Sequence, residues 1–186
     1  PQAGGDEAAG AASFRKDFQV GADVVSARLY STALGVYDAF LNGHRVGRMT
    51  EDGTMEYDEL KPGYTQPKVR KLYYTYDVTG MLQAGAVNTL SAWVTGGWWI
   101  GGIVSRAGSL ENAFAAKLVI TYADGKQDVL CTDTSWQGAY TGPMLYGDIY
   151  NGETYDATQS MDWMQPGFEG QWTAVHKNTE FTGTVE

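Results

Sequence analysis

Short segments in which apolar and polar residues alternate recur along most of the chain. A repeat of two residues is the period of a β-strand that buries one face, and it argues against a predominantly helical fold. Glycine-containing turns separate the segments, and the pattern predicts about eight to ten strands at the spacing of a sandwich. The clearest segments are residues 13–20, 24–34, 35–47, 71–82, 88–99 and 113–136.

The dipeptide Asn42-Gly43 marks a tight turn inside one of these segments. A two-residue type I′ hairpin needs positive φ angles at both central positions, and Asn followed by Gly tolerates them well. The residues before the turn should therefore form a strand with alternating sides. We expect Tyr37, Ala39 and Leu41 to share one face of that strand.

The chain shows no alternation of helices with strands, so a parallel sheet is not expected. We therefore predict an all-β fold, an antiparallel β-sandwich of jelly-roll, galactose-binding-like type. A length of 186 residues fits one domain. Residues 1–12 are small and polar and are predicted to be a flexible linker. The sandwich is predicted to span residues 13–178, and residues 179–186 to form a tail that leads to a next domain.

Charge and composition exclude several classes of partner. A net charge of −9 opposes binding to a phosphate backbone, so we expect no nucleic acid. No apolar run approaches the roughly 20 residues of a membrane-spanning helix, so we expect no membrane partner. Cys131 is the single cysteine, which excludes an intrachain disulfide and a cysteine-rich zinc cluster.

The residues that support catalysis are few. The two histidines, His44 and His176, accompany no G-x-S-x-G motif, so a nucleophilic triad has little support. A self-standing sandwich glycosidase stays open as an alternative, with Asp148 and Glu153 as the carboxylates on either side of a scissile bond. Nothing in their spacing forces these two carboxylates to converge.

The stretch Tyr146–Ala157, YGDIYNGETYDA, predicts a strand, an Asn-Gly turn and a second strand. Its oxygen-bearing side chains are of the type that calcium prefers, which makes calcium a candidate cofactor. In a second interpretation the tyrosines pack and the acids accept structural hydrogen bonds, so that Glu153→Ala should destabilise the fold. The candidate metal ligands are Asp148, Asn151, Glu153 and Asp156.

Aromatic residues make up 13% of the chain, and several lie in turn-rich stretches where a ring can be exposed. Sugar rings present apolar C–H faces edged by hydroxyl groups, so a site for them combines an exposed aromatic ring with a few polar groups. On consecutive positions, at most one of Trp98 and Trp99 should belong to the core. The candidate ligand-binding residues are Trp98, Trp99, Tyr64, Tyr150, Asn151 and Glu153.

A series of motifs, in order along residues 13–176, resembles the N-terminal accessory domain of bacterial alpha-L-rhamnosidases. Each motif alone is weak, but their order makes the resemblance specific. Tyr64 stands where the family usually has Trp after Pro-Gly. The motifs are FRKDFQV, SARLYSTALGVYDAFLNGHRVG, PGYT, YYTYDVTGML, NTLSAWVTGGWW, LVITYADGKQDVLCTDTSWQ, GPMLYGDIYNGETYDA and PGFEGQWTAV.

The resemblance implies a noncatalytic jelly-roll module beside the catalytic domain of a glycoside hydrolase that removes terminal L-rhamnose. In that family the acid and base residues sit in a separate α/α-barrel, and some members of the module family bind L-rhamnose through calcium. The expected partners are therefore an L-rhamnose-containing glycan and the catalytic domain of the same polypeptide. A purely structural domain that packs against the barrel is the alternative. An extracellular or periplasmic location is favoured over a cytoplasmic one.

Overall fold

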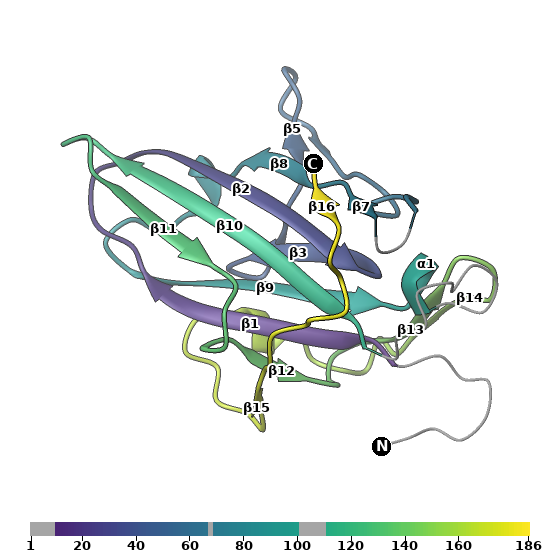
Figure 1. Ribbon diagram of the computed structural model, residues 1–186. Coiled ribbons are helices and arrows are strands. Elements are labelled where there is room, and N and C mark those ends of the chain that lie inside the picture. Colours follow the sequence, from purple (N-terminus) through teal and green to yellow (C-terminus); the bar gives the residue numbers. More distant parts are fainter. Residues whose placement is uncertain (1–9, 67–68, 101–110) are drawn as a thin grey trace.

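The computed structural model describes residues 10–66, 69–100 and 111–186. Within them, two antiparallel sheets face each other across one core (Figure 1), which confirms the predicted antiparallel β-sandwich. The six-stranded sheet has the order β15 (Thr173–Ala174), β12 (Gln137–Ala139), β1 (Ala12–Gln19), β9 (Val87–Thr95), β3 (Val36–Leu41) and β4 (His44–Arg45). The four-stranded sheet has the order β11 (Gln127–Cys131), β10 (Ala113–Tyr122), β2 (Val24–Leu34) and β8 (Tyr74–Asp77).

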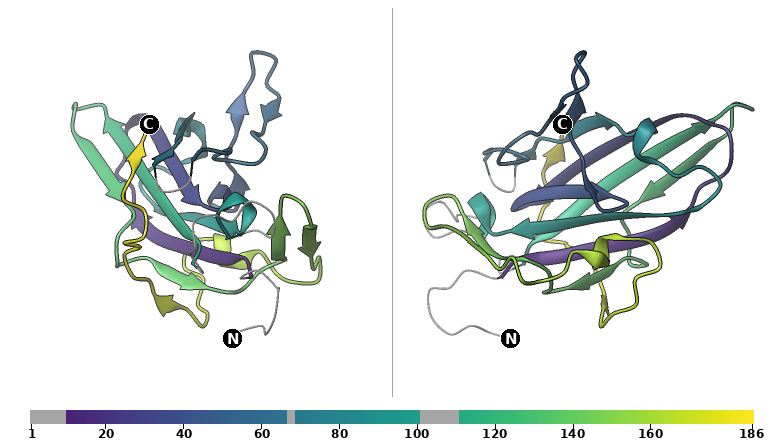
Figure 2. Two further views of the ribbon diagram at one scale, coloured as in Figure 1. Left: turned by 45° about the vertical axis from the view of Figure 1, so that its right-hand side comes forward. Right: turned by 180° about the vertical axis from the view of Figure 1, so that it is seen from behind.

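Shorter elements lie at the rims of this sandwich. Strands β5 and β6 form a hairpin that projects from the sandwich in Figure 2. Strand β7, which precedes β8, pairs in parallel with β16 near the C-terminus. None of the helices in the described part of the chain has the length and apolar character needed to cross a bilayer. These elements are β5 (Arg48–Met49), β6 (Met55–Glu56), β7 (Arg70–Lys71), β16 (Thr184–Val185), β13 (Met144–Asp148), β14 (Gly152–Tyr155), α1 (Gly97–Ile100), η1 (Thr79–Met81) and η2 (Asp162–Met164).

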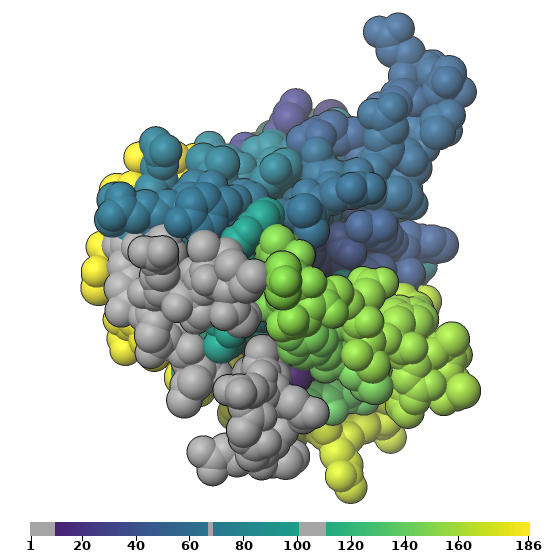
Figure 3. All heavy atoms as spheres, turned by 90° about the vertical axis from the view of Figure 1, so that its right-hand side faces the viewer, coloured from purple at the N-terminus to yellow at the C-terminus, as the bar shows by residue number. Residues whose placement is uncertain are grey.

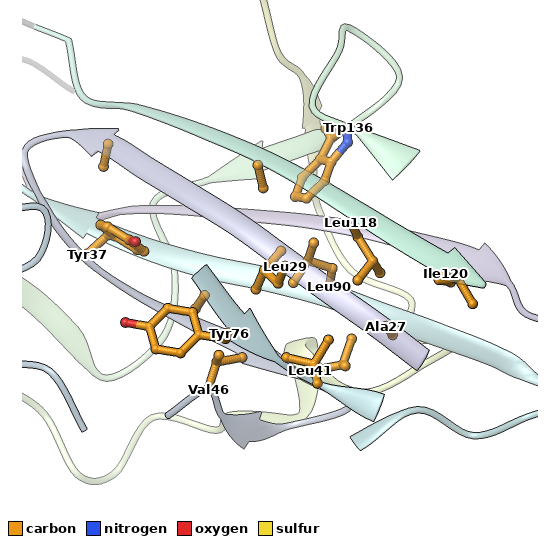
Figure 4. Packing of buried hydrophobic residues seen from close by; sticks show 14 of the residues in the cluster. Ala27, Leu29, Tyr37, Leu41, Val46, Tyr76, Leu90, Leu118, Ile120 and Trp136 are labelled. Carbon is orange, nitrogen blue, oxygen red and sulfur yellow. The ribbon is translucent and has the colours of Figure 1, made fainter. Parts of the chain in front are cut away.

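The core lies between the two sheets and takes one side of each long strand (Figure 4). Leu29 and Leu118 enter it from the four-stranded sheet, and Leu90 enters from the six-stranded sheet. Each is at most 1% exposed, and burying such a side chain contributes about 1.5–3 kcal/mol. Tyr37, Ala39 and Leu41 of β3 also point into this core, which confirms that they share one face.

The turn after β3 has the predicted geometry. Asn42 and Gly43 both have positive φ, at 53° and 80°, and β3 pairs with β4 across them. Asn42 also donates a hydrogen bond from Nδ2 to Asn88 Oδ1 at 2.7 Å and accepts one at Oδ1 from the amide of Thr89 at 2.9 Å. The turn is therefore fastened to β9 as well as to β4.

Residues 48–66 first form the β5–β6 hairpin and then run along the part of the β3 edge that β4 leaves unpaired. The amide of Tyr37 donates a hydrogen bond to the carbonyl oxygen of Lys61 at 3.0 Å. The Lys61 side chain is fully buried, and its Nζ lies 3.2 Å from Asp38 Oδ1. Covering an edge in this way removes backbone groups that could pair with another chain.

The two ends of the described chain contact the sandwich. Residues 1–9 of the predicted linker lie outside the described residues, whereas Ala11 is buried and donates a backbone hydrogen bond to Leu145. In the predicted tail, Phe181 packs against the cluster that contains Trp99, and β16 pairs with β7. Residues 179–186 are therefore held against the sandwich, and their continuation into a further domain stays a prediction.

Candidate functional site

The residues predicted from the sequence to bind a ligand lie at one end of the sandwich, where α1 contacts β3 and β13. Figure 3 shows this end, with the β13–β14 hairpin in green and the loop that precedes β7 in blue beside α1. Three segments that are far apart in the sequence thus meet at one surface. We call this surface the aromatic rim and define it by Tyr64, Trp98 and the β13–β14 hairpin.

A close approach between α1 and β3 sets the position of the two tryptophans. Gly97 has φ of 49°, and a Cβ atom there would lie 2.5 Å from Cγ2 of Val36 and 3.0 Å from its backbone nitrogen. Only glycine fits both the angle and the space. The strand predicted for residues 88–99 therefore ends at Thr95, and Trp98 and Trp99 lie on a single helical turn instead of a strand.

Trp99 belongs to the core and Trp98 to the surface. Trp99 is fully buried, and its Nε1 donates a hydrogen bond to the carbonyl oxygen of Glu111 at 3.1 Å. The ammonium of Lys71 lies 5.0 Å from the centroid of the Trp99 ring. Trp98 is only partly buried. At most one of the two rings is thus a core residue, as predicted, although helical geometry and not strand alternation separates them.

Tyr64 and Trp98 form an aromatic pair. Their ring centroids are 6.1 Å apart with an angle of 63° between the planes, and Tyr64 is 53% exposed. An edge-to-face pair of this kind holds each ring in a defined orientation, which lowers the conformational cost of presenting it to a ligand. The structure therefore brings together two residues that the sequence analysis selected 34 positions apart.

The β13–β14 hairpin confirms the predicted strand, turn and strand. Asp148 Oδ1 accepts hydrogen bonds from the amides of Tyr150 and Asn151 at 2.8 and 2.7 Å, so this acid has a structural role in the turn. The prediction that the tyrosines pack is wrong for Tyr150, which is 73% exposed, and for Tyr155, which is 48% exposed. β13 and β14 form a separate two-stranded sheet, which does not enclose these rings as the two large sheets enclose the core.

The four predicted calcium ligands do not converge. Asp148 lies at the turn, opposite Gly152, whereas the amide of Asp156 bonds to Pro143 at the other end of the hairpin. Asp156 Oδ1 accepts hydrogen bonds from the amide and the hydroxyl of Thr158, and these bonds lower the pKa of the carboxyl group. Among the described residues, no group of three or more His, Cys, Asp or Glu side chains is arranged to hold a metal ion. The four residues do not form one ligand set in this arrangement, and a calcium site stays a prediction.

The carboxylates of Asp148 and Glu153 are not paired across a cleft. Glu153 lies opposite Gly147 in the ladder, so its side chain shares a face with that residue and Asp148 points to the other face. Glu153 is exposed. Its replacement by alanine is therefore expected to cost little stability, contrary to the sequence-based expectation. Two carboxylates on opposite faces do not have the arrangement that glycosidases use.

Two buried lysines escaped the sequence analysis. Lys61 and Lys71 are 0% and 4% exposed, yet lysine is seldom buried, and nothing in the local sequence separates them from surface lysines. Burial lowers the pKa of both ammonium groups, and for Lys61 the nearby Asp38 acts in the opposite direction.

Comparison with known proteins identifies the family. A sequence profile described as "Alpha-L-rhamnosidase N-terminal domain" matches residues 22–186. The chain belongs to this family. It is 41% identical over 175 residues to an alpha-L-rhamnosidase of Streptomyces avermitilis, a match that covers 90% of this chain and 16% of the relative. An alpha-L-rhamnosidase of Alteromonas sp. (strain LOR) is 35% identical over 176 residues, covering 92% of this chain and 18% of the relative.

Solved structures agree with this family. The alpha-L-rhamnosidase of Streptomyces avermitilis complexed with L-rhamnose superposes with a TM-score of 0.82 at 38% identity, over 95% of this chain and 17% of that chain. The enzyme of Aspergillus terreus gives a TM-score of 0.80 at 34% identity, over 94% of this chain and 20% of that one. The resemblance seen in the motifs is confirmed. The chain spans 16% to 18% of the length of these two curated relatives.

Proposed function

We propose that this domain is a noncatalytic module of a bacterial alpha-L-rhamnosidase that contacts a rhamnose-containing glycan and positions it for a catalytic domain of the same polypeptide. The observation that carries the proposal is the exposed Tyr64–Trp98 pair. L-Rhamnose is a deoxy sugar whose methyl group and C–H face suit contact with an aromatic ring. Tyr150 and Asn151, on the hairpin beside α1, supply a further exposed ring and an amide.

Fluorescence titration of the 186-residue chain with L-rhamnose tests this role. Trp98 is the partly exposed tryptophan of the rim, so sugar contact should shift or quench its emission. Trp98→Ala should abolish the change, and Tyr64→Ala should weaken binding by about tenfold, since stacking on one ring contributes about 1–1.5 kcal/mol. Trp172→Phe is the matched control, because Trp172 packs against Trp163 on the outer face of the six-stranded sheet.

The same titration tests the calcium expectation, with one arm in calcium and one in a chelator. Equal binding in the two arms would mean that the aromatic rim holds sugar without a metal. Binding that requires calcium would mean that a metal ion takes part in the sugar site. A chain that binds no sugar in either arm would contradict the proposed function.

A second candidate function is supported by the hairpin itself. Leu145, Ile149, Tyr150 and Tyr155 are 45%, 37%, 73% and 48% exposed, a concentration of apolar surface that is typical of an interface. In this alternative the hairpin packs against the catalytic domain and the module is structural. Tyr150→Ser combined with Leu145→Ser in the full-length enzyme should then lower its thermal stability while leaving rhamnose binding by the 186-residue chain unchanged.

A further inference from the structure

A cleft of about 720 Å³ lies between the start of β10 and strand β12. The C-terminal segment 173–185 forms one of its walls, and Figure 1 shows this segment in yellow running from β15 past β10 to β16. Phe14, Phe114 and Trp136 contribute aromatic surface to the lining. Its volume is that of a small-ligand site, and we call it the C-terminal cleft.

Lys71 lines this cleft and is 4% exposed. Its ammonium lies 5.0 Å from the centroid of the Trp99 ring, and no charged group of the described residues acts on it beside the effect of burial. Burial lowers the pKa of this group, as expected for a cation without an anionic partner. A buried ammonium is costly unless an anion accompanies it, so the position calls for a negatively charged group.

The carboxylates of the lining are already engaged. Glu111 Oε2 lies 2.8 Å from His176 Nε2, and Asp133 Oδ1 accepts a hydrogen bond from the amide of Ser135 at 2.8 Å. Neither of these contacts involves Lys71. Lys71 therefore has no carboxylate partner in the described lining, although the chain as a whole carries a net charge of −9.

We propose that the C-terminal cleft binds a sugar-sized organic carboxylate, with Lys71 pairing with the carboxylate and the aromatic residues of the lining contacting the ring face. The ligand class is that of a uronic acid. None of the residues that define the aromatic rim lines this cleft, so the two sites are separate. Neutral rhamnose lacks a carboxylate to pair with Lys71, and the proposal does not depend on the proposed function.

Calorimetric titration of the 186-residue chain with D-glucuronate, D-glucose and acetate tests the proposal. D-Glucuronate should bind at least about tenfold more tightly than either, because glucose lacks the charge and acetate lacks the ring and hydroxyl groups. Glucose that binds as well as glucuronate, or acetate that does so, would overturn it. Trp98→Ala should leave glucuronate binding unchanged, which separates this site from the rim.

Lys71→Met retains the stem that covers Trp99 and removes the charge, and it should weaken glucuronate binding at least about tenfold. Lys117→Met is the matched control, since Lys117 is exposed on β10 and does not line the cleft. Unchanged affinity in folded Lys71→Met would contradict the assignment. If that variant does not fold, the indole N–H resonances of Trp99 and Trp136 in the unmodified chain decide the matter: they should shift with glucuronate, and their invariance would reject the site.

Discussion

Arg15 donates a hydrogen bond from Nε to the carbonyl oxygen of Trp163 at 3.0 Å, and so joins the first strand to a segment 148 residues later. The guanidinium also bonds to the carbonyl oxygens of Gln165 and Phe168 and pairs with Asp17. Its planar fork reaches several acceptors at once, which a lysine ammonium does not do with the same geometry. Arg15 thus fastens residues 163–168 to β1, in addition to the packing of Trp163 and Met164 against Phe40.

Arg15→Met should therefore destabilise the domain strongly. Arg15 is 3% exposed, and its loss would leave the buried carbonyl oxygen of Trp163 without this donor and Asp17 without its cation, at a cost of about 3–5 kcal/mol. The thermal midpoint should fall by about 2–4 °C for each kcal/mol in a domain of this size. Lys126→Ala is the control, since Lys126 pairs with Asp124 in an exposed turn and should change stability by at most about 0.5 kcal/mol. Similar midpoints for the two variants would refute the role given to Arg15.

Gly97→Ala and Gly63→Ala form a matched pair at the aromatic rim. Both positions have positive φ, at 49° and 82°, so alanine should cost about 1 kcal/mol in backbone strain at either. A new Cβ at position 97 would also collide with Val36, whereas no atom lies within 4 Å at position 63. Urea unfolding should show a further loss of about 1–3 kcal/mol for Gly97→Ala. Equal losses would mean that α1 is not pressed against β3.

Lys61→Met and Asp38→Ala should differ widely in stability. Lys61 Nζ lies 3.2 Å from Asp38 Oδ1 and between the rings of Tyr37 and Tyr76. Methionine removes the buried charge and keeps much of the volume, so its effect should stay within about 1 kcal/mol. Asp38→Ala leaves the ammonium buried without its nearest anion and should cost about 3–5 kcal/mol. Chemical denaturation of both variants is the measurement, and a large loss for Lys61→Met would mean that the ion pair is itself stabilising.

The domain should lose stability in acid, in part through Asp77. The hydroxyl and the amide of Thr79 donate to Asp77 Oδ1, and these bonds lower the pKa of the carboxyl group. A carboxyl group with a depressed folded-state pKa contributes stability above its unfolded value of about 3.9, and the contribution is lost as pH falls through the lower, folded value. Thermal midpoints of the protein and of Asp77→Asn between pH 2 and about 6 should show a shallower acid slope for the variant. Equal acid slopes for the protein and the variant would mean that Asp77 does not contribute to the loss of stability in acid.

Local patterns in the sequence were enough to predict the sandwich. Alternation with period two placed Tyr37, Ala39 and Leu41 in the core, and Asn42-Gly43 predicted the turn, because both signals act between neighbouring residues. The same reasoning failed at Trp98 and Trp99. Their helical turn follows from the contact between Gly97 and Val36, two residues that are distant in the sequence.

The amino-acid sequence by itself determined the fold class, the family and the aromatic residues available for a rim. Only the tertiary structure decided that Tyr64 meets Trp98, that the acids of the β13–β14 hairpin lie apart, and that Lys71 faces a cleft without a partner. The physical reason is that strand period and turn geometry depend on residues a few positions apart. Burial, charge pairing and ligand geometry depend instead on side chains brought together from opposite ends of the chain.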